Sequence, residues 1–203
     1  MERSRGHPLL LACSPRQGGN CDTAMAIIRQ GMGRVNKPAP PVTFLRDHAV
    51  SPCVSCGHCA RHRLECPLFA RDGSAPLFDA LGHASSLVLA APLYFYHVPA
   101  QLKALIDRSQ PWWMARDVWG ETPSSRRVAH IILIGGRSRG ERLFEGALLT
   151  LRYWLDLFGF DLAEPLPLHD LDGHGALGQS GERSAQVARY AETIAASMPS
   201  AEA

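Results

Sequence analysis

The sequence predicts a three-layer α/β fold built around a parallel sheet, because short apolar runs alternate with helical patterns along most of the chain. Two of these runs, Ser86–Ala91 and Arg127–Ile134, are almost continuously apolar, as expected for strands that helices cover on both faces. A length of 203 residues fits one domain of ordinary size. We therefore expect a single doubly wound sandwich over residues 1–203.

The expected elements follow one another as strand–helix units. The strands are expected at Pro8–Cys13, Val42–Asp47, Ser86–Ala91, Arg127–Ile134 and Phe160–Leu168. The helices are expected at Asn20–Gly33, Pro76–Leu81, Pro99–Gln110, Glu141–Phe158 and Ser184–Ala196. Three segments interrupt the regular spacing, namely Ala49–Asp72, Pro92–Val98 and Gln110–Ser125, and function is expected there. Residues 170–203 are expected to form a loop and the last helix, and no role is assigned to Asp170–Gly178.

Composition and charge exclude several classes of function. About a fifth of the residues are charged, nearly half are apolar, and the formal net charge is only +2, which argues against disorder and against a nucleic-acid partner. The apolar stretch Pro8–Cys13 is too short for a signal peptide and is better explained as a buried strand. No run approaches the length that spans a membrane. We expect a soluble, cytoplasmic protein.

The loop Ser14–Cys21 lies between a predicted strand and a predicted helix, where backbone N–H groups and the positive end of the helix converge. Arg16 adds a fixed positive charge, and Ser14 and Asn20 add neutral donors, a mixture that suits a phosphate monoester. The Gly-Lys-Ser/Thr ending of a P-loop is missing. The alternative is that Gly18–Asn20 is only a turn that caps the helix.

Three motifs in this order resemble the NADPH-dependent FMN reductase family. They are Ser14-Pro15-Arg16-Gln17-Gly18-Gly19-Asn20, Ala91-Pro92-Leu93-Tyr94-Phe95, and Gln101-Leu102-Lys103-Ala104-Leu105-Ile106-Asp107-Arg108. With a cysteine segment after the second strand, the chain resembles the iron–sulfur flavoprotein branch of that family over roughly residues 8–170. The resemblance implies a flavodoxin-like fold with strand order 2-1-3-4-5.

The resemblance also implies an FMN site made of two loops. The FMN phosphate would be held by Ser14, Arg16, Gly19, Asn20 and Cys21, although the family usually has Ser or Thr at the last of these positions. The isoalloxazine and ribityl groups would be held by Pro92, Leu93, Tyr94, Phe95 and Tyr96. Such a turn supplies the apolar walls and backbone donors that a flat flavin ring needs, but an aromatic turn can equally be core packing.

Two further groups lie beside these motifs. Gly135 and Gly136 follow the fourth expected strand, where they would let the backbone pass close to the flavin or would simply form a turn. Asp107 and Arg108 belong to the third motif, and an ion-pair or packing role is expected for them rather than catalysis. No catalytic acid, base or nucleophile is predicted.

The cysteines Cys53, Cys56, Cys59 and Cys66 are spaced compactly enough to wrap one [4Fe–4S] cluster. Zinc is the main alternative, although structural zinc sites usually pair two knuckles across a longer loop. A redox disulfide and an empty site also remain open. His58 and His62 lie in the same segment and are expected to be solvated.

Three functions are compatible with these features. The first is an electron-transfer flavoprotein in which FMN exchanges electrons with the cluster, using a carrier such as ferredoxin. The second is an NAD(P)H-dependent FMN or quinone reductase without a cluster, and the third is a non-catalytic metal or redox sensor. Self-association is also expected because aromatic residues are enriched at interfaces, and the family resemblance implies a homodimer or homotetramer. The residues that suggest it are Trp112, Trp113, Met114 and Trp119. The alternative is that these aromatic residues cover the flavin or pack internally.

Overall fold

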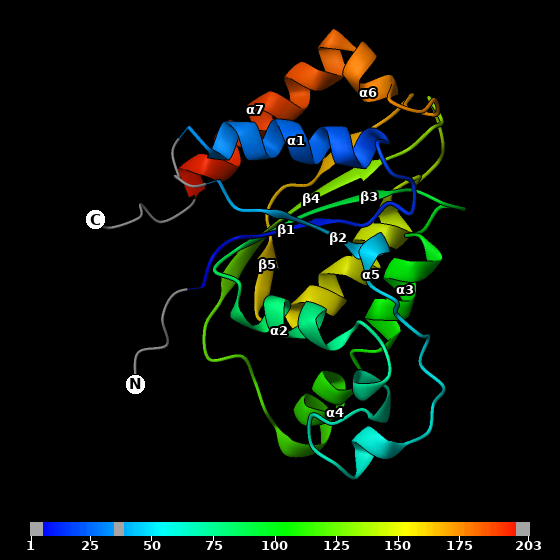
Figure 1. Cartoon of the computed structure of the whole chain (residues 1–203), viewed down its shortest axis with the longest axis vertical. Coiled ribbons are helices and arrows are strands. Elements are labelled where there is room, and N and C mark those ends of the chain that lie inside the picture. Colours follow the sequence, from blue (N-terminus) through cyan, green and yellow to red (C-terminus); the bar gives the residue numbers. More distant parts are fainter. Residues whose placement is uncertain (1–5, 35–38, 198–203) are drawn as a thin grey trace.

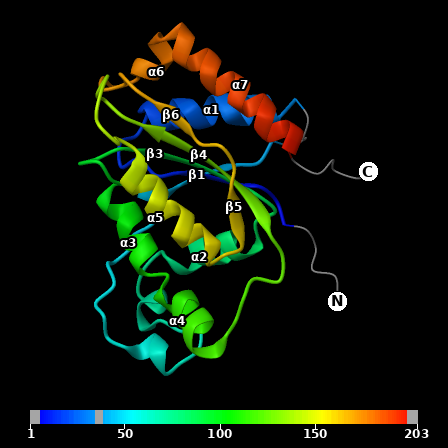
Figure 2. The same cartoon turned by 180° about the vertical axis from the view of Figure 1, so that it is seen from behind.

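The parallel sheet lies between two layers of helices. A computed structural model describes residues 6–34 and 39–197 of the chain. One face of the sheet is covered by α1 (Asn20–Met32), α6 (Ala176–Gln179) and α7 (Gly181–Ser197) (Figure 1). The other is covered by α2 (Ala75–His83), α3 (Ala100–Asp107) and α5 (Glu145–Asp156), as the view from behind also shows (Figure 2). The predicted three-layer sandwich is confirmed.

The strand order β2-β1-β3-β4-β5 is the predicted one. The strands are β1 (Leu9–Ala12), β2 (Val42–Phe44), β3 (Leu87–Pro92), β4 (Arg127–Ile134), β5 (Phe160–Leu162) and β6 (Leu166–Leu168). All pairings between these strands are parallel. The carboxyl ends of β1, β3 and β4 therefore lie side by side at one edge of the sheet.

The sequence placed one strand at Phe160–Leu168, whereas the structure has two short strands along β4. Leu162 lies opposite Ala129, and Leu166 lies opposite Ile132. The edge strand thus has one residue more than β4 over this interval, which is the definition of a β-bulge. Pro165 lies within the bulge, where its missing N–H removes no ladder bond.

Other element boundaries also differ from those predicted. The strand expected at Val42–Asp47 ends at Phe44, and the chain continues as a 3₁₀ turn. The side-chain amide of Gln101 donates hydrogen bonds to the carbonyls of Leu45 and His48, at 2.8 Å each, and these bonds take the place of strand pairing. The helix expected from Glu141 begins four residues later, at Glu145. The segment after α3, expected to be irregular, contains α4 (Gln110–Trp119).

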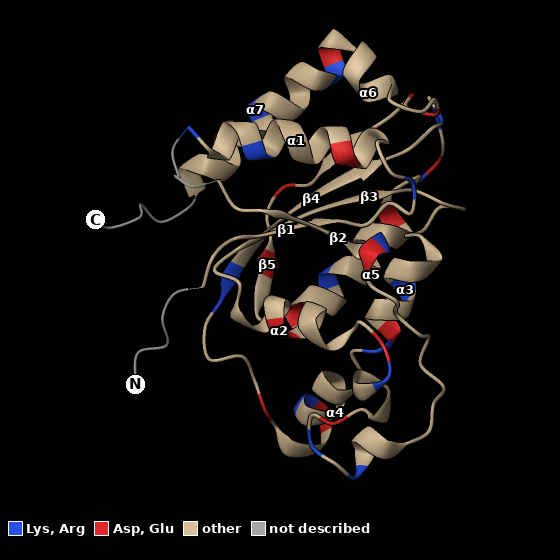
Figure 3. Cartoon of the chain, in the orientation of Figure 1, with Lys and Arg blue, Asp and Glu red and all other residues tan. Residues whose placement is uncertain are grey.

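The core has two parts because side chains on a strand alternate between the faces of the sheet. In β1, Leu9 and Leu11 point toward α2, α3 and α5, whereas Leu10 and Ala12 point toward α1 and α7. Charged residues of both signs are interspersed on the outer helices and loops, in keeping with the small net charge (Figure 3). Within residues 6–34 and 39–197, no helix has the length and apolar character needed to cross a membrane.

Helices α1 and α7 pack closely where Gly31 faces Ala191. A Cβ atom added at Gly31 would lie 2.7 Å from the Cβ of Ala191, which is too close without movement of one helix. Gly82 in α2 is a matched comparison, since a Cβ there meets nothing within 4 Å. Alanine substitutions at these two glycines therefore distinguish the effect of helix propensity on stability from the effect of packing between helices.

We predict that Gly31→Ala lowers the free energy of unfolding by roughly 1–3 kcal/mol, because overpacking outweighs the gain in helix propensity. Gly82→Ala should instead raise it by up to about 1 kcal/mol. Urea unfolding of both variants measures the difference. Equal effects at the two positions would contradict the close approach of α1 and α7.

Candidate functional site

Three loops leave the sheet together at the carboxyl edge of β1, β3 and β4. The N–H of Cys13, just after β1, donates to the Ala90 carbonyl of β3 at 2.8 Å, and the N–H of Leu93, just after β3, donates to the Ile134 carbonyl of β4 at 2.8 Å. The expected phosphate loop, the aromatic turn and the glycine pair are therefore neighbours. This is the edge at which open α/β sheets bind ligands.

The phosphate loop ends in a helix that has no side-chain cap. Gly18 has a left-handed φ of 65°, Gly19 occupies the N-cap position, and no side chain caps the N–H groups of the first turn there. The first N–H groups of α1 have no partner within the helix, so they face the loop as donors. Ser14 is buried and its hydroxyl accepts the N–H of Arg16 at 3.1 Å, while the side chain of Arg16 is exposed. The loop is therefore preorganised for an anion.

Asp22 and Arg46 form a charge pair at this helix end that the sequence analysis missed. The Asp22 carboxylate accepts the Gly18 N–H at 2.7 Å, and the guanidinium of Arg46 donates to both of its oxygens at 2.9 Å. Arg46 also lies 4.2 Å from the centre of the Phe44 ring. The pair fixes the loop while Arg46 offsets the negative charge of Asp22, which would otherwise oppose an anion. Twenty-four residues separate the partners, so no local pattern could have indicated the contact.

Two residues expected to bind phosphate have side chains engaged elsewhere. The Asn20 amide nitrogen donates to the carbonyls of Leu171 and Gly173 at 2.9 and 3.1 Å, and its oxygen accepts the Leu177 N–H at 3.0 Å. Cys21 is buried in the core between α1 and the sheet, and this burial raises the pKa of its thiol. A contact from either residue to a phosphate would come from its backbone N–H.

The segment at residues 171–177, to which the sequence assigned no role, lies across the phosphate loop. Leu171, Gly173 and Leu177 of this segment bond to Asn20, and His174 donates from Nε2 to the Gln17 carbonyl at 3.1 Å. Asp172 lies so close to Gly136 that a Cβ on that glycine would be 2.7 Å from a carboxylate oxygen. The glycine is therefore required by this packing. The segment therefore contacts both the loop after β1 and the loop after β4.

The aromatic turn has an unusual backbone. Tyr94 and His97 exchange N–H···O bonds of 2.8 and 3.0 Å, and the residues between them, Phe95 and Tyr96, have φ values of 52° and 64°. Two central residues with positive φ define the turn that Asn-Gly normally occupies, and bulky residues are strained there. The Phe95 side chain is nonetheless fully exposed. Its position is therefore not explained by core packing.

A pocket of about 180 Å³ joins the aromatic turn to the loop after β4. Its lining consists of Leu93, Phe95, Tyr96, Gly135, Gly136, Arg137 and Leu143. Five of these are residues that the sequence analysis proposed for the flavin. Arg137 and Leu143 are additions, and Arg137 donates to the Tyr96 hydroxyl at 3.3 Å. Pro92 ends β3, and Tyr94 begins the turn, beside this lining. A larger cavity of about 340 Å³, between α1 and α7, contains none of the sequence motifs.

The cysteine segment lies beside α4, away from the carboxyl ends of β3 and β4, in both views (Figures 1 and 2). None of residues 51–70 is buried, and the backbone curls through positive φ at Ser55, Gly57 and Leu64. Partial burial, with the nearby thiols of the other three cysteines, raises the pKa of Cys59. The Sγ of Cys53 accepts the N–H of Ser55 at 3.5 Å. The four cysteines thus gather around Cys59 in one exposed loop.

Arg108 holds both ends of the cysteine segment. Its buried guanidinium donates to the Ser51 carbonyl at 3.1 Å and to the Asp72 carboxylate at 2.7 Å. Burial alone would raise the pKa of Asp72, but hydrogen bonds from Ser74, Ser51 and Arg108 outweigh it and lower that pKa well below its usual range. The ion-pair role expected for Arg108 is confirmed. Asp107 instead pairs with Lys103, at 2.6 Å on the surface.

The tryptophans of α4 divide between the core and the surface. Trp112 stacks on Phe78 with ring centres 4.6 Å apart and contacts Phe158 at 5.2 Å, so it packs within the chain. Trp113 and Trp119 are exposed. Self-association through these residues remains a prediction, now confined to the exposed pair.

Fold and site together define a flavodoxin-like protein, with a phosphate loop after β1, a pocket at the switch-point edge and a cysteine segment after β2. Residues 68–194, more than half of the chain, match the model of a family described as having a flavodoxin-like fold. An iron–sulfur flavoprotein from Methanosarcina thermophila is 32% identical over 146 residues, which cover 72% of this chain and 71% of that protein. The chain belongs to this flavodoxin-like family, in its iron–sulfur flavoprotein branch, as the motifs predicted.

Two further comparisons agree with this assignment. An iron–sulfur flavoprotein from Methanocaldococcus jannaschii is 31% identical over 100 residues, or 48% of this chain and 49% of that protein. Among solved structures, the NAD(P)H:quinone oxidoreductase from Methanothermobacter marburgensis superposes with a TM-score of 0.67 at 14% identity, covering 94% of this chain and 100% of that one. At such low identity the superposition shows the fold alone.

We predict that Asp72→Asn lowers the free energy of unfolding by about 3–5 kcal/mol at pH 7, because it leaves the buried Arg108 charge without its partner. Asp107→Asn removes an exposed ion pair and should cost less than about 1 kcal/mol. Because the pKa of Asp72 is lower in the folded chain than in the unfolded chain, its stabilisation exists above the usual carboxyl pKa and is lost as the pH falls below about 4.

Denaturant unfolding at a series of pH values measures both effects. Stability should fall less steeply on acidification in Asp72→Asn than in the unaltered protein. The same acid dependence in both proteins would show that Asp72 is not the group responsible.

Proposed function

We propose that this protein is an FMN-dependent oxidoreductase that exchanges electrons between FMN and a [4Fe–4S] cluster held by Cys53, Cys56, Cys59 and Cys66. The observation that carries the proposal is the convergence of an uncapped helix end and an apolar pocket at one edge of the sheet, with a separate four-cysteine loop on the same chain. The relatives named iron–sulfur flavoproteins support the same pair of cofactors.

The first half of the proposal concerns the flavin. A single terminal phosphate fits the free N–H groups of α1 together with Arg16, whose exposed side chain lies over Gly19. The ring would enter the pocket, where Leu93 and Leu143 would exclude water and the Arg137 guanidinium would supply a positive charge. Bound FMN supplies both hydride and single-electron chemistry. The chain's own contribution is position, charge and exclusion of solvent.

The second half concerns the cysteines, and their spacing along the chain favours a cluster over zinc. Structural zinc sites usually pair two Cys-x2-Cys knuckles across a longer loop, whereas Cys53, Cys56 and Cys59 follow one another at three-residue steps. Cys66 comes seven residues after Cys59, which leaves enough chain for all four thiolates to hold one cluster. The N–H of Ser55 on Cys53 Sγ is the kind of bond that tunes such clusters.

A second candidate is an NAD(P)H-dependent FMN or quinone reductase in which the cysteine loop is structural. The exposed edge of the pocket at Phe95 favours it, because a flat substrate could reach a bound flavin there. Turnover with NADH, NADPH or a quinone, measured against reduction of ferredoxin, would separate the two candidates.

We predict that Arg16→Ala weakens FMN binding by roughly 1.5–3 kcal/mol, because it removes a charge-assisted contact to phosphate. The matched control is Arg152→Ala, which removes an exposed arginine from α5, outside the pocket. Fluorescence titration of the apoprotein with FMN measures both affinities, and mass analysis of the released flavin should show FMN rather than FAD. Unchanged affinity in Arg16→Ala would exclude the assigned phosphate site.

We predict that anaerobically purified protein holds about four iron and four sulfide per chain. Cys56→Ala should lower both while FMN stays bound, because the flavin site is built by other loops. Val54→Ala alters an exposed side chain of the same loop and should keep its iron. Stoichiometric zinc with neither iron nor sulfide in the anaerobic sample would refute the cluster and leave the second candidate.

A further inference from the structure

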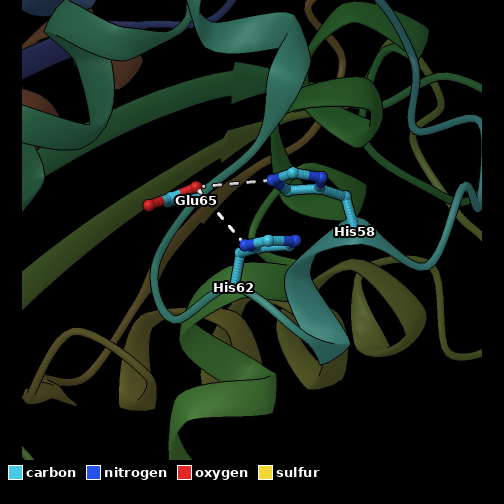
Figure 4. A group of neighbouring side chains, drawn as sticks. All are labelled: His58, His62 and Glu65. Carbon is cyan, nitrogen blue, oxygen red and sulfur yellow. Dashed lines mark hydrogen bonds and ion pairs between the residues drawn. The ribbon is translucent and has the colours of Figure 1, made fainter.

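We infer that His58, His62 and Glu65 form a separate binding site for a divalent transition-metal ion such as Zn²⁺, distinct from the site made by the cysteines. One ligand atom of each residue lies within 4.8 Å of the other two (Figure 4). Of the residues that the structure describes, no other three His, Cys, Asp or Glu side chains bring their ligand atoms so close together.

The distances are near those that a metal ion requires. Glu65 Oε2 lies 3.4 Å from His58 Nε2 and 4.0 Å from His62 Nδ1. Ligand atoms bonded at about 2.0–2.1 Å to a tetrahedral ion lie about 3.3–3.4 Å apart. The first distance already fits, and the second needs a small side-chain rotation. His62 and Glu65 are free to make it, since about half or more of each side chain is exposed.

The backbone brings the three ligands together. The N–H groups of Arg61 and His62 both donate to the His58 carbonyl at 3.0 Å, which places the two imidazoles on one side of a tight turn. Leu64 then has a left-handed φ of 56°, and the Glu65 N–H donates to the His62 carbonyl at 3.3 Å. The chain therefore reverses between His62 and Glu65. This reversal turns the carboxylate back toward the imidazoles, as Figure 4 shows.

The charges around the cluster suit a cation. Arg63 lies between His62 and Glu65 in the sequence, but its guanidinium pairs with Glu121, so it does not neutralise Glu65. The two imidazole rings stack with centres 4.1 Å apart and an interplanar angle of 14°. Two imidazoles and a carboxylate leave a fourth position on the ion for water.

This site has a structural consequence for the cysteine loop. Its ligands span residues 58–65, a stretch that includes Cys59 and ends just before Cys66. An ion bound there would fix the length and direction of that stretch, and would do so through nitrogen and oxygen ligands rather than sulfur. Imidazole and carboxylate favour zinc and related ions, whereas iron–sulfur clusters select thiolates, so the two sites would not compete for the same metal.

Calorimetric titration with Zn²⁺ tests the inference on anaerobically purified protein whose iron, sulfide and flavin contents have been measured. We expect one equivalent to bind, and we expect His62→Ala and Glu65→Gln each to weaken binding about a hundredfold. The matched control is His83→Ala, because His83 and Asp79 form an exposed pair at 3.1 Å without a third ligand. This variant should bind Zn²⁺ like the unaltered protein. Unchanged flavin content would show that each variant is folded.

X-ray absorption at the zinc edge identifies the ligands. Nitrogen and oxygen neighbours at about 2.0–2.1 Å support the site, whereas sulfur at about 2.3 Å would assign the zinc to the cysteines and overturn it. Failure of the protein to bind Zn²⁺, or retention of full affinity in both ligand variants, would also overturn it. The iron and sulfide analysis keeps this outcome separate from the proposed cluster, because a cysteine loop without iron would bind zinc through sulfur.

Discussion

The buried guanidinium of Arg108 connects the cysteine loop to the rest of the molecule. It lies at the end of α3, where it bonds to Ser51 and Asp72 on either side of the loop and lies 5.2 Å from the centre of the Phe69 ring. None of residues 51–70 is buried, so the loop has no core that could hold it in place by itself. A buried charge is costly unless it is paired. Arrangements of the loop that would leave the Arg108 guanidinium without Ser51 and Asp72 are therefore disfavoured. Gln101, seven residues earlier in α3, holds the chain that follows β2 by donating hydrogen bonds to the carbonyls of Leu45 and His48.

The carboxyl edge of the sheet, where we propose that flavin binds, is held by a different set of contacts. There the parallel strands place three loops side by side, and long-range polar contacts then fix each loop. Asn20 binds the segment at residues 171–177, and Arg46 binds Asp22. The strained backbone at Phe95 and Tyr96 belongs to the same edge. Strain of this kind persists where the surrounding structure enforces it, and it occurs often at ligand sites.

The two proposed sites are therefore built by separate parts of the chain. Loops at the carboxyl edge of the sheet form one, and the segment between β2 and α2 forms the other. The third sequence motif acquires a clear role in this arrangement. Its arginine bonds to both ends of the cysteine segment and its glutamine bonds to the chain just before that segment, while Lys103 and Asp107 pair with each other at the surface. The motif therefore positions the cysteine segment rather than the pocket.

From the sequence alone, hydrophobic periodicity indicated the layers, and the motifs that resemble a known family indicated the strand order, because both are local properties of the chain. It also placed five of the seven residues that line the pocket. Only the tertiary structure showed that the Asn20 side chain bonds to residues 171–177, that Cys21 is buried in the core, and that Trp112 packs within the chain. These facts depend on contacts between residues distant in sequence, such as Asn20 with Leu177 and Arg46 with Asp22. Such contacts form when packing brings the elements together, and no local pattern encodes them.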